Sequence, residues 1–473
     1  MKNGVRLLVG VGLMALAGSC AGRNLPPEPD SYVAADAIGA ERAAELAASP
    51  AATWLDDLNS PEMSALAREA LAGSPELQIV EARARAATWR ARGAFGSNLL
   101  PSLSVGVDGT RTEEPTAGDE RIRTEIMTSS VVASWEIDLW GRLTSRAMAA
   151  DLSADAAEED LNDARLSVAG QSATGWVDVL EAQQLLALAQ EDLQTRERAL
   201  DLTQRRYDAG IATSLTLRTA RSQVASARAF EAQAQDQLLI ASRRLQEIMG
   251  RYPDGTLRAD GELPQLGELT AAGAPTDLLE RRPDVLAAES RMRAAGFRMH
   301  EARAAMLPRL TLTGTAGNSG AALNQIDDSV NMVSNLVAGL TMPIFNGGAL
   351  FSESRASAAD RRAAASEYVR TAIAAWREVE GTISADRSLE VREAQFAIAA
   401  DEAREAQALA EREYARGVAT LFELIDAYTR RIDAERGLIT ARAARVTNRI
   451  SYHVALGGGA RTGGIDEDRE VTP

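Results

Sequence analysis

Two seven-residue segments decide the fold, Tyr207-Asp208-Ala209-Gly210-Ile211-Ala212-Thr213 and Tyr414-Ala415-Arg416-Gly417-Val418-Ala419-Thr420. They share the pattern Tyr-x-x-Gly-[Ile/Val]-Ala-Thr and lie 207 positions apart. The same offset relates Leu100-Pro101 to Leu307-Pro308. This period is far longer than the roughly 20–50 residues of solenoid repeats. The chain is therefore predicted to be one large unit made twice, as repeat 1 over residues 61–263 and repeat 2 over residues 264–459.

Each copy contains a long segment without proline, from 116 to 252 and from 344 to 472. Both segments are rich in Ala, Leu, Glu, Gln and Arg, which favour helix. The glycine of the shared pattern suits a helix end that needs positive φ, and the threonine three residues later can cap the next helix. We therefore predict helical hairpins over about 142–250 and about 348–456. In the first arm, one seam follows the seven-residue spacing of a coiled coil: Val179, Leu186, Leu193, Leu200 and Tyr207.

Ahead of each helical hairpin, apolar residues alternate with small or polar ones, which predicts strand hairpins over about 101–139 and about 308–345. Four strands cannot close into a barrel, and open strand edges cannot face lipid. Strands that enter a membrane would therefore have to share one barrel among several chains. Two chains would make eight strands with a filled interior, whereas three would make twelve with room for a pore.

Residues 1–19 have the features of a secretory signal peptide, with Lys2 and Arg6 before an apolar stretch that is too short to span a bilayer. The only cysteine of the chain, Cys20, follows directly. The segment Leu16–Cys20 resembles the lipobox of bacterial lipoproteins, which implies that Cys20 becomes a lipidated N-terminus. An ordinary signal peptide with an incidental cysteine is the alternative. Residues 20–60 would form a lipidated N-terminal segment, and residues 460–473 a polar tail.

Composition excludes several functions. The 473 residues include 51 Lys+Arg and 67 Asp+Glu, a formal net charge of −16, which argues against a nucleic-acid partner. With 2 His and 1 Cys, the chain offers no disulfide framework or zinc-finger pattern, and no phosphate loop or nucleophile motif appears. We therefore expect no cofactor, no metal site and no enzymatic activity.

The lipobox, the duplicated strand and helix hairpins and the paired tips together resemble the TolC-like outer membrane efflux proteins, in the lipoprotein branch that serves pumps of the resistance-nodulation-division (RND) class. Asp138-Leu139-Trp140-Gly141-Arg142 and Pro343-Ile344-Phe345-Asn346-Gly347-Gly348 resemble the strand-to-helix junctions of that family. The resemblance implies a mostly α homotrimer. Its twelve-stranded outer-membrane β-barrel, with four strands per chain, would continue into a long periplasmic α-helical barrel. It also implies outer membrane lipids, a periplasmic adaptor and an inner-membrane RND pump as partners, with this chain as the passive exit duct for drugs and small molecules.

The family also implies a periplasmic gate, because its members carry two acidic residues three positions apart after the second tip. Glu423 and Asp426 occupy these places, on one helix face. Three chains would form two acidic rings that attract cations, and crowding would raise the pKa of these carboxyls. The first half has Thr216 and Thr219 there instead. A solvated helix face is the simpler alternative.

The tips are the expected contacts with the adaptor, although the same residues could simply form the turns. Some relatives also tether the closed tip through a tyrosine and an arginine. Tyr414 matches that tyrosine, but Ala419 holds the place of the arginine, which leaves Arg416 as a candidate replacement. The predicted adaptor contacts are Tyr207, Gly210, Thr213, Tyr414, Gly417 and Thr420.

Other functions remain open at this point. A channel of this kind could serve type I protein secretion or metal-ion efflux. A periplasmic coiled-coil scaffold that forms no channel is a further alternative, and it would require both strand hairpins to be soluble.

Overall fold

The computed structural model describes residues 54–58, 60–115, 121–267, 269, 280–320 and 332–458. The predicted class, mostly helical with a small antiparallel sheet, is confirmed. The elements are η2 (Trp54–Leu58), α4 (Pro61–Gly73), α5 (Pro75–Leu99), β1 (Ser102–Pro115), β2 (Arg121–Ile137), α6 (Arg142–Asp208), α7 (Ser214–Ile248), α9 (Pro283–Ala304), β3 (Arg309–Gly320), β4 (Met332–Thr341), α10 (Ala349–Arg416) and α11 (Leu421–Ala455). Repeat 1 contains α5, β1, β2, α6 and α7, and repeat 2 contains α9, β3, β4, α10 and α11 in the same order.

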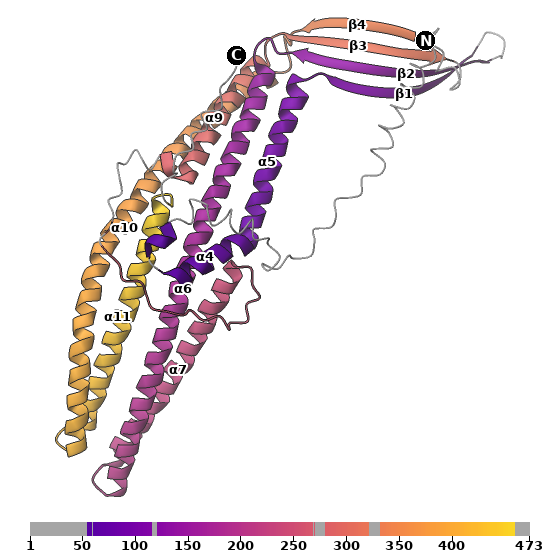
Figure 1. The fold of residues 1–473 in the computed structure, drawn as a ribbon. Coiled ribbons are helices and arrows are strands. Elements are labelled where there is room, and N and C mark those ends of the chain that lie inside the picture. Colours follow the sequence, from indigo (N-terminus) through magenta and orange to yellow (C-terminus); the bar gives the residue numbers. More distant parts are fainter. Residues whose placement is uncertain are drawn as a thin grey trace.

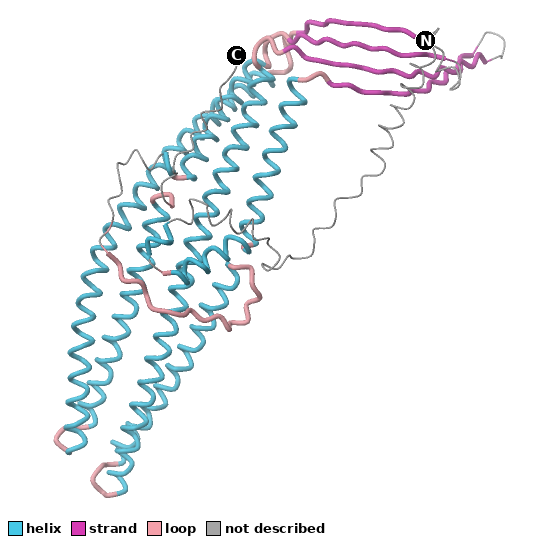
Figure 2. Tube along the Cα trace, in the orientation of Figure 1, coloured by secondary structure: helices cyan, strands magenta, loops and turns pink. Residues whose placement is uncertain are grey.

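The molecule is elongated, with the sheet at one end and the turns of both helical hairpins at the other (Figure 1). The longest rods, α6 and α10, have 67 and 68 residues, about 100 Å each at about 1.5 Å per residue. Figure 2 shows that loop structure is confined to the tips, the strand-to-helix junctions and a band around the middle. No helix among these described segments is long and apolar enough to cross a membrane.

Glycines set where the long rods begin. Gly141 and Gly348 precede α6 and α10 with φ of 69° and 83°, a conformation that other residues rarely adopt. The carboxylate of Asp138 then accepts hydrogen bonds from the backbone N–H groups of Leu143 and Thr144, at 3.1 and 2.7 Å. These bonds satisfy donors that a helix leaves free in its first turn. The chain can therefore turn sharply from strand into rod.

The four strands form one antiparallel sheet in the order β1-β2-β3-β4, so β1 and β4 are its edges. Leu103 pairs with Ala133, which also pairs with Gly314, so alternate residues of all four strands share a face. We call one side the apolar face: Leu103, Val105, Val107, Met127, Val131, Ala133, Trp135, Ile137, Leu310, Leu312, Ala316, Leu336, Ala338 and Leu340. The other side, the hydroxyl face, carries Ile126, Val132, Val333 and Val337 but is rich in Ser and Thr: Ser102, Ser104, Thr110, Thr112, Thr124, Thr128, Ser130, Ser134, Thr311, Thr313, Thr315, Ser319 and Thr341.

The main hydrophobic core lies at mid-length. Trp54 and Met63, from η2 and α4, are buried there with Trp176 of α6, Leu245 of α7 and Ile450 of α11. The two repeats meet closely at this level, because a Cβ added to Gly170 of α6 would lie 2.7 Å from a methyl group of Val454. The hairpins therefore extend toward their tips from a packed centre.

Candidate functional site

The two tips are built alike. Gly210 and Gly417 have φ of 76° and 78°, as a residue in the left-handed region after a helix requires. In each tip the next residue donates its N–H to a carbonyl of the preceding helix: Ile211 to Arg206 at 2.8 Å, and Val418 to Glu413 at 3.0 Å. The predicted glycine breaks are therefore the turns of the two hairpins.

The tyrosines of the two tips differ in their surroundings. Tyr207 is 40% exposed, whereas Tyr414 is 4% exposed. The Tyr414 hydroxyl lies 2.9 Å from the hydroxyl of Thr203, and Arg206 donates a hydrogen bond of 2.8 Å to the Tyr414 carbonyl oxygen. Tyr414 thus joins the second hairpin to α6 of the first. Within the chain, the arginine that contacts Tyr414 is Arg206, and a role for Arg416 stays a prediction.

Glu423 caps its own helix. Its carboxylate accepts hydrogen bonds from the backbone N–H of Thr420 at 2.6 Å and from the Thr420 hydroxyl at 2.9 Å, while the Glu423 N–H donates to that hydroxyl oxygen at 3.3 Å. This reciprocal pair is a capping box. The two bonds from Thr420 hold the pKa of Glu423 below its ordinary value. In the first hairpin, Thr213 caps with its hydroxyl alone, accepting from the Thr216 N–H at 3.2 Å.

Asp426 lies on the same exposed side of α11 as Glu423, and Leu424 and Tyr428 are buried on the other side. The Asp426 carboxylate pairs with Arg430, four residues on, at 2.7 Å. Both carboxylates therefore point away from the contact between the hairpins. Of the predicted adaptor contacts, five are exposed at the tips: Tyr207, Gly210, Thr213, Gly417 and Thr420. Cys20 lies outside the described residues.

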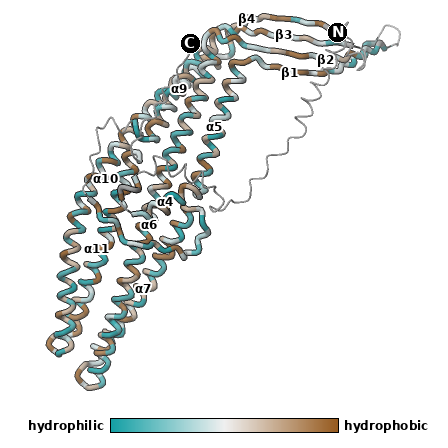
Figure 3. The backbone as a smooth tube through the Cα atoms, in the orientation of Figure 1, coloured by the Kyte–Doolittle hydropathy of each residue, from teal (hydrophilic) through white to brown (hydrophobic). Residues whose placement is uncertain are grey.

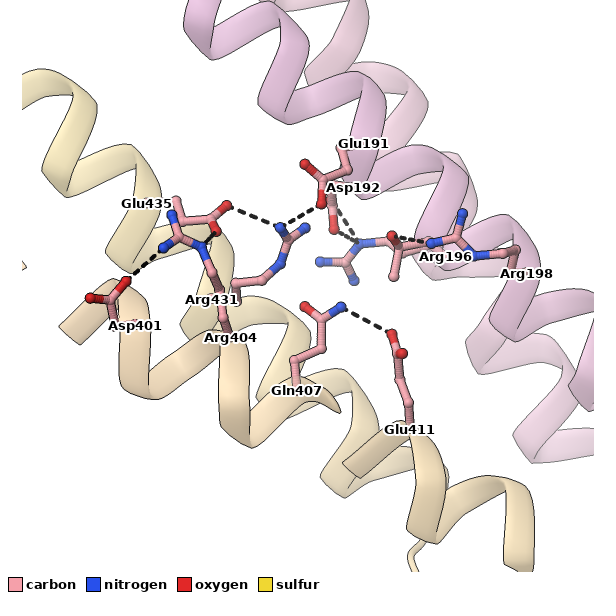
Figure 4. Close-up of polar contacts among 11 residues, drawn as sticks. Glu191, Asp192, Arg196, Arg198, Asp401, Arg404, Gln407, Glu411, Arg431 and Glu435 are labelled. Carbon is pink, nitrogen blue, oxygen red and sulfur yellow. Dashed lines mark hydrogen bonds and ion pairs between the residues drawn. The ribbon is translucent and has the colours of Figure 1, made fainter. Parts of the chain in front are cut away.

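A buried ion network connects the hairpins farther from the tips (Figure 4). The Arg431 side chain, 5% exposed, pairs with Glu191 of α6 at 2.8 Å and with Glu435 of its own helix at 3.0 Å. Glu435 also pairs with Arg404 of α10 at 2.5 Å. One guanidinium therefore bridges both repeats.

None of the sequence patterns above predicted this network, although the sequence contains a signal for it. Arg431 and Glu435 continue the alternating three- and four-residue spacing of the buried side of α11, where Leu424, Tyr428 and Leu438 are apolar. Charged residues at core positions of a coiled coil lose their water shell, so they require partners. That spacing alone could have marked Arg431 and Glu435.

The comparisons with known proteins agree with this architecture. The family model described as outer membrane efflux protein matches residues 66–251 and 274–458, one segment in each repeat. The chain is 31% identical over 431 residues to the pyoverdine export outer membrane protein OpmQ of Pseudomonas putida, covering 88% of this chain and 90% of that protein. It is 30% identical over 456 residues to the outer membrane protein OprJ of Pseudomonas aeruginosa, covering 94% and 95%.

Solved structures share the fold. The outer-membrane channel OprN has a TM-score of 0.80 at 24% identity, over 86% of this chain and 92% of that one. A membrane protein from Pseudomonas aeruginosa has a TM-score of 0.79 at 29% identity, over 84% and 94%. With both repeats matched and most of each relative covered, the chain belongs to the outer membrane efflux protein family.

Proposed function

We propose that three copies of this chain form the outer membrane channel of a tripartite efflux system. An inner-membrane RND transporter would pump drugs and small molecules through a periplasmic adaptor into this passive exit duct. The observation that carries the proposal is the sheet, which has two open edges and one apolar face, at the end of two long helical hairpins. Related proteins named as efflux pump components, such as the toluene efflux pump outer membrane protein TtgC of Pseudomonas putida, support the assignment.

The sheet argues for assembly. The strands β1 and β4 each present one unpaired edge. The backbone N–H and C=O groups along such an edge cost several kcal/mol each if they face lipid without a partner. Leu103 and Leu336 on the apolar face are both 72% exposed, and a contiguous exposed apolar surface marks a contact with membrane or protein. Three sheets joined edge to edge would make twelve strands, with the apolar face toward lipid and the hydroxyl face toward a watery lumen.

The tips supply the gate of this duct. Three copies of Glu423 and of Asp426 would form two acidic rings at the periplasmic entrance. Tyr207, Gly210, Thr213, Gly417 and Thr420 would receive the adaptor, while the buried Tyr414 holds the tip together. Cys20 would carry the lipid that anchors the mature chain at the outer membrane. Hypotheses of type I protein secretion or metal-ion efflux share the channel and differ in cargo.

Cysteine cross-linking tests the assembly. Ser104→Cys on β1, combined in turn with Val333→Cys, Asn335→Cys or Val337→Cys on β4, should give covalent dimers and trimers, because these strands would meet only between copies. The control pair Ser134→Cys and Thr313→Cys lies on neighbouring strands of one sheet and should stay within one chain. A scaffold without a barrel would give no intermolecular product from any edge pair.

Conductance measurements test whether the chain forms a channel, and drug sensitivity tests which cargo it carries. The purified full chain should form cation-preferring channels in planar bilayers. Deletion of its gene should sensitise cells to drugs and dyes. Sensitivity to metal ions alone, or loss of a secreted protein alone, would favour the other cargoes.

A further inference from the structure

The apolar face of the sheet ends in a group of charged side chains. We call this group the charged end: Arg111, Glu113, Arg121, Arg123 and Glu125. In the strand register Arg111 is opposite Glu125 and Glu113 is opposite Arg123, so the group continues the face that carries Val107 and Met127. Figure 3 shows the change from brown to teal toward the free end of β1 and β2.

Among the described residues, the charged end lies at the extremity that is farthest from the helices. Gly320, the last described residue before the gap at 321–331, pairs with Met127, and residues 121–126 of β2 lie up to six positions farther along that strand from the helices. This is roughly 20 Å at about 3.3 Å per residue. Because the helices extend into the periplasm, this extremity faces the outer leaflet of the membrane. The charged end then lies where the apolar lipid chains stop and the headgroups begin.

The arginines of the charged end are held in place but remain accessible. Glu113 accepts hydrogen bonds from Arg111 at 3.1 Å and from Arg123 at 2.9 Å, and its other oxygen lies 3.9 Å from Arg121. Arg111 also lies 3.6 Å from Glu125. The three arginine side chains are nevertheless 53%, 75% and 58% exposed. Carboxylates on the same face therefore order the guanidinium groups without covering them.

The donors of this group outnumber its acceptors. Three guanidinium groups carry about fifteen N–H donors, whereas two carboxylates accept about eight hydrogen bonds. Within the charged end, three positive charges face two negative ones, while Glu114 lies on the opposite face of the sheet and Asp119 and Glu120 lie outside the described residues. Guanidinium groups bind phosphate in a bidentate manner and are the preferred side chains for it. The group therefore suits an anion with several oxygens, presented from the membrane side.

We propose that the charged end binds the phosphate groups of lipid headgroups in the outer leaflet. This inference rests on the proposed function, because it needs the apolar face to be in contact with lipid. The lipid chains would lie along Val107, Val105 and Leu103, and the phosphate would lie against the arginines at the end of that surface. Charge complementarity suits any phosphate, and the continuity with the apolar face favours a lipid over a free anion.

Binding of lipid A to the full-length trimer in detergent tests this, with native mass spectrometry as the readout. Diphosphoryl lipid A should bind more tightly than its monophosphoryl form with the same acyl chains. The triple variant Arg111→Gln, Arg121→Gln and Arg123→Gln should bind about tenfold more weakly or worse, since one charge-assisted contact is worth roughly that factor. Equal binding of the two lipids, or no loss in the triple variant, would overturn the proposal.

Two further arms separate the competing explanations. The control variant Arg205→Gln, Arg361→Gln and Arg362→Gln removes the same charge from exposed helix positions and should bind lipid A as the wild type does. Glu113→Gln with Glu125→Gln should bind it more tightly, because the competing carboxylates are gone. Displacement of lipid A by inorganic phosphate at millimolar concentration would show a free-anion site instead and would contradict the lipid assignment.

Channel recordings separate this inference from the proposed function. The triple variant should keep wild-type conductance, because the charged end lies on the outside of the sheet. Normal channels without phosphate-dependent lipid binding would remove this inference alone. A wild-type chain that forms no channel and binds neither lipid would remove the proposed function as well.

Discussion

The guanidinium of Arg206 lies over the ring of Tyr414, with its central carbon 4.8 Å from the ring centroid. The same guanidinium donates a hydrogen bond of 2.8 Å to the Tyr414 carbonyl oxygen. Arg206 belongs to the first helical hairpin and Tyr414 to the second. These contacts, with the bond between Tyr414 and Thr203, connect the two hairpins close to their tips.

Loss of this connection should loosen the closed tip. Tyr414→Phe removes only the hydrogen bond to Thr203, worth about 1 kcal/mol. Arg206→Ala removes the hydrogen bond to the Tyr414 carbonyl oxygen and a cation–π contact of about 0.5–2 kcal/mol. We expect a higher resting conductance in planar bilayers for both variants, and the larger rise for Arg206→Ala. Tyr207→Phe is the matched control, because its side chain is 40% exposed at the equivalent place. An equal effect of Tyr207→Phe would show that the tip responds to any tyrosine change.

Glu423 should act through both its charge and its cap. Glu423→Gln keeps an oxygen that can accept from Thr420 but removes the charge, so cation preference should fall while the Tm stays unchanged. Glu423→Ala should lower cation preference and also weaken the start of α11, by about 1 kcal/mol. Asp236→Asn, an exposed change on α7, is the control for charge alone. Unchanged ion selectivity in Glu423→Gln would remove Glu423 from the gate.

The pH dependence of selectivity separates two influences on Glu423. Crowding in a ring would raise its pKa, whereas the hydrogen bonds from Thr420 lower it. The bonds are direct and the carboxylate is exposed to water, so we expect the lowering to dominate. Because the pKa of Glu423 is lowered, its carboxylate keeps its charge, and with it the cap on α11, at every pH above the ordinary pKa of 4.5. Charge and cap are lost only as the pH falls below that value. Reversal potentials that lose cation preference already near pH 6 would contradict this.

The sequence was sufficient for the two helical hairpins and the four strands, but not for the contacts between them. Proline-free arms, glycine breaks and strand alternation are local signals, so they predicted both helical hairpins and all four strands. The capping box was also visible, because Thr420-x-x-Glu423 has its spacing. Tyr207 and Tyr414 occupy equivalent places in their repeats, and only the packing of the second hairpin against Thr203 and Arg206 distinguishes them.

The buried ion network should tolerate the loss of Glu191 better than the loss of Glu435. Glu191 is 59% exposed, and without it Arg431 still has Glu435, so Glu191→Ala should cost at most about 1 kcal/mol. Glu435→Ala leaves Arg431 and Arg404 without their buried carboxylate and should cost about 3–5 kcal/mol. Thermal unfolding in detergent measures both changes. A similar fall in Tm for the two variants would mean that the contact across the hairpins matters as much as the one within α11.

Asp163 should make stability depend on pH in the opposite sense from Glu423. Burial in α6 raises its pKa from 3.8 to about 6, and the nearby carboxylates of Asp284, Asp160 and Glu378 add to this, against the guanidinium of Arg282. The folded chain therefore holds this proton more tightly than the unfolded chain, so its contribution to stability falls as the pH rises from about 4 to about 6. The full difference is about 3 kcal/mol, since one pKa unit corresponds to about 1.4 kcal/mol.

Asp163→Asn should remove that slope, because an amide does not titrate. We expect its Tm to exceed that of the wild type at pH 7 and to match it near pH 4, where the wild-type carboxyl is protonated. Arg282 keeps its partners Asp284 and Glu378, both at 2.8 Å, so the variant leaves that buried guanidinium paired. Asp201→Asn is the control, because it removes the same charge from an exposed position of the same helix. A Tm gain that is equal in both variants, or independent of pH, would point to net charge and not to the buried carboxyl of Asp163.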